Sequence, residues 1–133
     1  MATRSTIWMK NDDGSFDGIY CHWDGYLENN GKILVEHYQD KEKVEKLMEL
    51  GAISSLDMEV DCPDGHSFDH PVAGCVVAYH RDRGERYINY GCMNFYDTHR
   101  YFEEYNYFFI DGEWYYYSNN ELLKVKDHIK KIS

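Results

Sequence analysis

Residues 107–117 read Tyr-Phe-Phe-Ile-Asp-Gly-Glu-Trp-Tyr-Tyr-Tyr, and this stretch decides the fold class. Two runs of large apolar and aromatic residues flank Asp111-Gly112, a dipeptide that favours a two-residue type I′ turn. The runs 107–110 and 113–117 are therefore expected to pair as an antiparallel hairpin.

Two more hairpins are expected upstream of this one. The strand-like runs 6–10 and 16–23 flank a turn-rich cluster at 11–15. The runs 75–80 and 85–90 flank Arg81-Asp82-Arg83-Gly84, which reads as the tip of another hairpin. Residues 54–60 are expected to form a short strand, and the polar segment 61–74, with its two prolines, reads as a long loop.

Helical spacing of apolar residues appears between and after the hairpins. It predicts either one helix over 31–50 or two helices broken near Gln39-Asp40, with Gly51 ending the pattern. A short helix is expected over 97–105. The capping-box pattern Ser118-Asn119-Asn120-Glu121 predicts a last helix over 120–131, with Lys130 and Lys131 where the helix dipole favours cations.

These elements predict a single domain over 1–133 of the α+β class. We expect a mainly antiparallel sheet of about five to seven strands built from hairpins, with about two or three helices. The hydrophobic fraction of 43% and the aromatic fraction of 17% exclude a disordered acidic chain.

The charge balance argues against one class of partner. With 14 basic and 24 acidic residues the net charge is −10, so direct binding to nucleic acid is not expected. The chain shows no signal-peptide pattern and no apolar run of about 20 residues, so we expect a cytoplasmic protein that does not enter membranes. Its four cysteines are then expected to be thiols.

The densest group of hydrogen-bonding and titratable side chains is Cys21-His22-Trp23-Asp24-Gly25-Tyr26. Strand alternation would place His22 and Asp24 on one face, where a carboxylate can orient an imidazole for proton transfer or ligand binding. A nucleophilic Cys21–His22 pair would require the backbone to bend. The hexapeptide therefore indicates a binding site, a catalytic pair or a structural corner.

Two other groups carry recognisable chemistry. Cys62, His66, His70 and Cys75 are zinc-ligand types, but their spacing is irregular, so we expect no metal and no other cofactor. The arginines of 81–86 could grip a phosphate or carboxylate, or only form a solvated turn. Sequence motifs of P-loop, dinucleotide, serine-hydrolase and zincin enzymes are absent.

Several motifs resemble a family of small proteins encoded by bacteriophages and prophages. The resemblance covers the first 56 residues well and extends more loosely to about residue 86. It rests on Met1-Ala2-Thr3-Arg4-Ser5-Thr6-Ile7, Gly18-Ile19-Tyr20-Cys21-His22-Trp23-Asp24-Gly25-Tyr26, Gly31-Lys32-Ile33-Leu34 with His37-Tyr38, Ala52-Ile53-Ser54-Ser55-Leu56 and the weaker 78–85. Leu27 stands where the family pattern has proline.

The resemblance implies an accessory protein that acts in the cytosol of an infected host cell. Such proteins commonly bind a host component, including defence systems, or sequester a nucleotide-derived signal. We therefore expect a non-enzymatic binding protein whose partner is a host protein or an anionic small molecule. The expected ligand-binding residues are Arg4, His22, Trp23, Asp24, Tyr26, Arg81 and Arg83, and no catalytic residue is assigned. The alternative is a small hydrolase or transferase using His22 and Asp24, with or without Cys21; a third interpretation is a purely structural domain.

Overall fold

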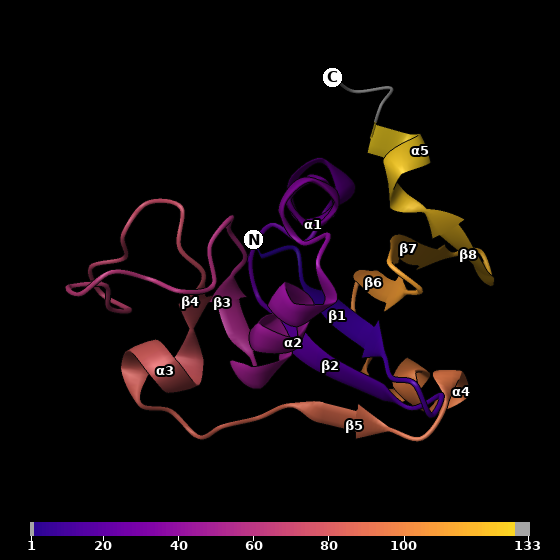
Figure 1. Cartoon of the computed structure of the whole chain (residues 1–133), viewed down its shortest axis with the longest axis horizontal. Helices are drawn as coiled ribbons and strands as arrows, with labels where there is room; N and C mark the ends of the chain where they lie inside the picture. The colour runs from indigo at the N-terminus through magenta and orange to yellow at the C-terminus, as the bar shows by residue number, and fades with distance from the viewer. Residues whose placement is uncertain (1, 130–133) are drawn as a thin grey trace.

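The computed structural model describes residues 2–129 and has an α+β fold built on one mixed sheet of eight strands (Figure 1). The strand order is β4-β3-β2-β1-β6-β7-β8, and β5 pairs with β2. The strands are β1 Ser5–Lys10, β2 Phe16–Cys21, β3 Ile53–Ser55, β4 Val77–Ala78, β5 Tyr90–Cys92, β6 Tyr105–Ile110, β7 Glu113–Ser118 and β8 Glu121–Lys124. The helices are η1 Leu27–Gly31 (a π-helix), α1 Lys32–His37, α2 Lys41–Glu49, α3 Tyr79–Arg83, α4 Phe95–Thr98, η2 His99–Tyr101 (a 3₁₀-helix) and α5 Val125–Ile129.

The expected α+β class is confirmed, although the described residues form eight strands and five α-helices instead of the expected five to seven strands and two or three helices, because β4, β5, α3 and α4 are each five residues or shorter. Five of the strand pairings are antiparallel, while β1 with β6 and β2 with β3 are parallel. The hairpin about Asp111-Gly112 forms as predicted, and both residues have the positive φ angles of a type I′ turn, 51° and 80°. The first hairpin, β1 with β2, also forms.

The segment 31–50 forms two helices, the second of the two alternatives. The chain leaves α1 at Tyr38, whose hydroxyl donates to the Asp57 carbonyl at 2.7 Å and whose own carbonyl accepts from Trp114 Nε1 at 2.8 Å. The second helix ends just before Gly51, which adopts the expected left-handed conformation at φ 73°.

The hairpin predicted over 75–90 is wrong. Asp82 Oδ2 accepts the Ala78 N–H at 2.8 Å, which satisfies a donor at the start of α3, and Gly84 at φ 73° follows the helix end. The run before α3 pairs with β3 instead, and the run after it continues to β5, which pairs with β2. Long-range pairing has therefore replaced the local one.

The helix predicted over 120–131 is also wrong in its first half. Asn119 and Asn120 have φ angles of 50° and 67°, so they form a type I′ hairpin turn and not a helix cap. The residues that follow form β8, which pairs with β7, and the helix begins only at Val125. Lys130 and Lys131 lie outside the described residues.

Two smaller predictions are partly confirmed. The helical segment expected over 97–105 is observed over 95–101, as α4 and η2, and Tyr105 already belongs to β6. The strand expected over 54–60 shortens to β3. The loop over 61–74 contains no helix or strand and extends away from the sheet at the left of Figure 1.

The sheet buries side chains on both faces. On one face α2 packs against β1 and β2, α5 packs against β7 and α1, and Ile7, Ile19 and Leu34 are fully buried there. On the other face Trp8, Phe16 and Phe108 form a second, aromatic cluster beneath residues 90–102. Among the described residues, no helix combines the length and apolarity that crossing a bilayer requires.

The Trp8 ring lies against Gly18, which gives the first prediction. A Cβ built on Gly18 would lie 2.2 Å from Trp8 Cε3, closer than real contacts allow. We expect Gly18→Ala to lower the free energy of unfolding by about 1 to 3 kcal/mol, because the buried indole has to shift. Gly91→Ala is the matched control, since a Cβ there meets nothing within 4 Å. Equal urea midpoints for the two variants would contradict this packing.

Candidate functional site

The predicted site, residues 21–26, forms a corner at the end of β2. Beyond Cys21 the chain continues beside β3, where the His22 N–H donates to the Ile53 carbonyl at 3.2 Å and the Trp23 N–H to that of Ser54 at 2.9 Å. Asp24 then turns the chain with a φ angle of 55°, a conformation that Asp and Asn tolerate better than most residues. The turn residue is thus Asp24 and not Gly25.

Gly25 has a different role, which is to anchor the corner. Its N–H donates to the Thr3 carbonyl at 2.8 Å, and its carbonyl accepts from the Tyr107 hydroxyl at 2.6 Å. A Cβ on Gly25 would lie 2.7 Å from Ser5 Cβ. Glycine is required here because of close approach, and the contacts fix the corner to β1 and β6.

The expected His22–Asp24 pair is not among the hydrogen bonds of the described residues. His22 Nδ1 is 2.7 Å from the Tyr20 hydroxyl, and its ring meets that of Trp23 edge-on at 4.8 Å between centroids. The left-handed turn at Asp24 ends the strand alternation on which the expectation rested. The corner therefore lacks the imidazole–carboxylate pair of a general base.

Cys21 is equally unsuited to act as a nucleophile. It is fully buried, and burial raises the pKa of its thiol to about 11. Asn30 Nδ2 lies 3.4 Å from its sulfur. A neutral thiol out of reach of solvent does not attack a substrate.

The corner does expose large aromatic side chains. Trp23 is 44% exposed and Tyr26 is 37% exposed. Arg4, also exposed, precedes Ser5, which pairs antiparallel with Cys21, so Arg4 lies beside His22. We call Arg4, His22, Trp23 and Tyr26 the corner surface; with the exposed turn residue Asp24, five of the seven predicted ligand-binding residues lie at this corner.

Arg81 and Arg83 take no part in this surface. Arg81 donates to the carbonyls of Val60 and Val76, the second at 2.8 Å, and forms an ion pair with Asp82 at 2.8 Å. Arg83 pairs with Glu85, and its guanidinium lies 4.0 Å from the centroid of the Phe68 ring. Both cations are thus engaged within the protein, and the hairpin tip expected to grip an anion is a helix.

Asp82 is the residue that organises this second region, and the sequence analysis did not single it out. Its side chain is 5% exposed, and Oδ2 lies 3.2 Å from Nε2 of His66, whose side chain is 3% exposed. Burial alone would raise the pKa of Asp82, but hydrogen bonds from Arg81 and the Ala78 N–H outweigh burial and lower it. In the sequence, the position of Asp82 two residues before Gly84 is the one feature that points to it.

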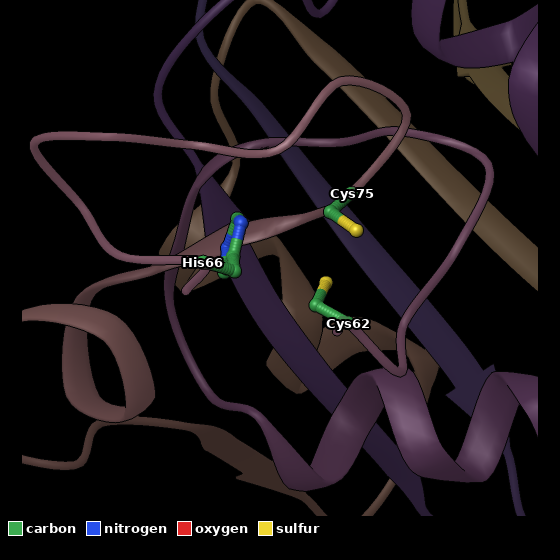
Figure 2. Close-up of side chains that lie close together, drawn as sticks. All are labelled: Cys62, His66 and Cys75. Atoms are coloured by element: carbon green, nitrogen blue, oxygen red, sulfur yellow. The ribbon is translucent and has the colours of Figure 1, made fainter. Parts of the chain in front are cut away.

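The segment 56–76 brings together three of the four residues whose side chains are of the kinds that bind zinc. One ligand atom each of Cys62, His66 and Cys75 lies within 4.8 Å of the others. Figure 2 shows the two sulfur atoms pointing into the space between the segments that carry them, with the His66 ring beside it. His70 is exposed and outside the group. Burial and the neighbouring Cys75 thiol raise the pKa of Cys62 to about 12.

Comparison with family models, with curated proteins and with solved structures finds no match to this chain.

The corner allows stability and recognition to be separated. We expect His22→Ala and Asp24→Asn to change the free energy of unfolding by no more than about 0.5 kcal/mol, because His22 is only half-buried, Asp24 is exposed and Asn tolerates the left-handed turn. Gly25→Ala is expected to destabilise by more than 1 kcal/mol or so, because its Cβ would collide with Ser5. Thermal and urea unfolding of the three variants measure this. Unfolding of His22→Ala and Asp24→Asn would make the corner a purely structural feature.

Asp82→Asn tests the buried network. We expect a loss of about 2 to 3 kcal/mol at neutral pH, because Arg81 and the Ala78 N–H lose their charged acceptor. The folded-state pKa of Asp82 is lowered from 3.8, so its contribution is complete above that pH and disappears as the pH falls through the lowered value. The difference from the native chain should therefore narrow below pH 3.8. Asp69→Asn, at an exposed position of the same loop, is the control; a difference that widens in acid would contradict the network.

Proposed function

We propose that this chain is a phage-encoded, non-enzymatic binding protein that uses the corner surface to bind a host protein. The observation that carries the proposal is the exposure of Trp23 and Tyr26 on a corner held rigidly by Gly25. Trp, Tyr and Arg are the residues that most often dominate binding energy at protein interfaces. Because the corner is already fixed, little conformational entropy is lost when it binds.

A protein partner is favoured over an anionic small molecule by the state of the arginines. Of the three cations expected to hold an anion, Arg81 and Arg83 are engaged internally, and only Arg4 accompanies the corner. The acidic chain, with a net charge of −10, complements a partner that presents basic groups around an apolar centre. The phage origin and the host target rest on the family resemblance, and countering a bacterial defence protein is the role that best fits it.

Catalysis by Cys21, His22 and Asp24 receives no support from the geometry. The thiol is buried with a raised pKa, and the imidazole contacts a tyrosine instead of the carboxylate. The corner offers contact area and hydrogen-bonding groups, which are the requirements of recognition.

Capture from host cells tests the proposal. The tagged chain, expressed in the bacterial host, should retain a host protein in near-stoichiometric amount, and the purified pair should bind directly. We expect Trp23→Ala and Tyr26→Ala each to weaken that binding at least about 30-fold, as at interface hot spots. Titration calorimetry on the purified pair gives the affinities.

Tyr96→Ala is the matched control, because Tyr96 is 82% exposed but lies on α4, away from the corner. Its affinity should equal that of the native chain. Full affinity in Trp23→Ala, or an equal loss in Tyr96→Ala, would refute the corner as the binding surface. A nucleotide released from the native chain on denaturation, and missing from Trp23→Ala, would replace the protein partner by a small molecule.

A further inference from the structure

We propose that Cys62, His66 and Cys75 form a zinc-binding site. This inference concerns the loop between β3 and β4 and is independent of the corner surface. It reverses the expectation drawn from residue spacing, because the folded loop sets the geometry and the number of intervening residues does not.

The three side chains already surround one point. Their ligand atoms lie within 4.8 Å of one another, whereas sulfur and nitrogen atoms around tetrahedral zinc are roughly 3.5 to 3.8 Å apart for bond lengths of about 2.3 and 2.0 Å. Side-chain shifts of about 1 Å would close the site (Figure 2). Two thiols and an imidazole form a soft donor set, which favours zinc over magnesium or calcium.

A hydrogen bond from Nε2 of His66 to Asp82 orients the ring so that Nδ1 can bind the metal. Nε2 of His66 lies 3.2 Å from the Asp82 carboxylate, while Nδ1 accepts the Val72 N–H at 3.0 Å. An imidazole that donates at one nitrogen and accepts at the other is neutral, and its one in-plane lone pair is on Nδ1, where it accepts the Val72 N–H. A carboxylate behind the histidine is the usual second partner of a zinc-ligating imidazole.

Binding at Nδ1 exchanges one partner for another. The lone pair of His66 that accepts the Val72 N–H passes to the metal, and both thiols release their protons to solvent as thiolates form. Val72 lies in the half-exposed part of the loop, where water can accept its freed N–H. The exchange therefore leaves no buried donor without a partner.

The fourth coordination position opens to the outside. A pocket of about 280 Å³ adjoins the group and is lined by Cys62, Pro63, Asp64, Gly65, His66, Arg81 and Asp82. Three protein ligands with a solvent-facing fourth position leave room for water or an external ligand. The site thus closes the long loop and keeps one position free.

Metal titration of the full-length chain tests the site. Reduced protein, freed of metal by a chelator, is titrated anaerobically with Zn²⁺ against a chromophoric competitor and with Co²⁺ as a spectroscopic probe. We expect one ion per chain, a thiolate-to-cobalt charge-transfer band and a rise in melting temperature with Zn²⁺. X-ray absorption should give about two sulfur and two nitrogen or oxygen neighbours.

Variants of the loop decide which residues bind. Cys62→Ser, His66→Ala and Cys75→Ser are each expected to weaken Zn²⁺ binding at least about 100-fold, beyond the usual effect of losing an outer-shell partner. His70→Ala in the same loop and Cys92→Ser in the aromatic cluster should bind as the native chain does. Cys62 is half-exposed, so its variant keeps the test valid if Cys75→Ser does not fold.

Three results would overturn the site. These are binding no tighter than about 10 μM in the native chain, binding unchanged in folded Cys62→Ser, or an equal loss in His70→Ala. Because Trp23→Ala leaves the loop untouched, failure of the corner surface to bind a partner would not affect this measurement, and loss of the metal would not affect the corner.

Discussion

The parallel pairing of β1 with β6 holds the two halves of the sheet together. It joins residues 5–9 to residues 105–109, so residues 11–104 form the connection between two neighbouring strands. A buried hydrogen bond from Thr6 Oγ1 to Asn106 Oδ1 at 2.7 Å lies in this register, and Thr6 also accepts from Trp8 Nε1 at 2.7 Å. Because an unpaired buried polar group is costly, a shift of the β1–β6 register by one residue would be unfavourable: it would break the Thr6–Asn106 bond and turn the apolar side chains of one strand to the wrong face.

The same pairing places the corner surface. Gly25 contacts Thr3 and Ser5 ahead of and within β1, and its carbonyl accepts from Tyr107 in β6. The corner is therefore fixed by the two strands that meet in the parallel pair and not only by its own hairpin. This explains how a polar, aromatic segment in a bend can present Trp23 in a defined position: the glycine beneath it is packed, while the indole remains partly in water.

Local signals in the sequence predicted what local contacts determine. The turn at Asp111-Gly112 follows from backbone preferences within two residues and is observed, whereas the sequence left open whether 31–50 forms one helix or two, and Tyr38 at the break bonds to the distant Asp57 and Trp114. Asn119-Asn120 matched a capping box, but two residues that tolerate left-handed φ also form a type I′ turn, and pairing with β7 favoured the turn. The sequence of 85–90 favours a local hairpin, because no short-range pattern reveals that β5 pairs with the distant β2. Among the site residues, the corner could be found from its composition, whereas the partners of Arg81 come from carbonyls that are distant in sequence.

The loop between β3 and β4 shows why the net charge of the chain does not reveal which cations are free to bind a ligand. Arg81 of α3 points inward to the carbonyls of Val60 and Val76 in this loop and to Asp82, so the loop is closed by an ion pair that is neutral overall and the acidic surface keeps its charge. The thiols beside that pair add no charge while protonated.

A divalent ion held by two thiolates and a neutral imidazole is likewise neutral overall, so binding would bring no uncompensated charge into the half-buried loop. Arg81 Nη2, 3.6 Å from the Cys62 sulfur, already offers a donor to the thiolate that would form. The polar network that closes the loop without metal is thus also the outer shell that a metal in this position requires.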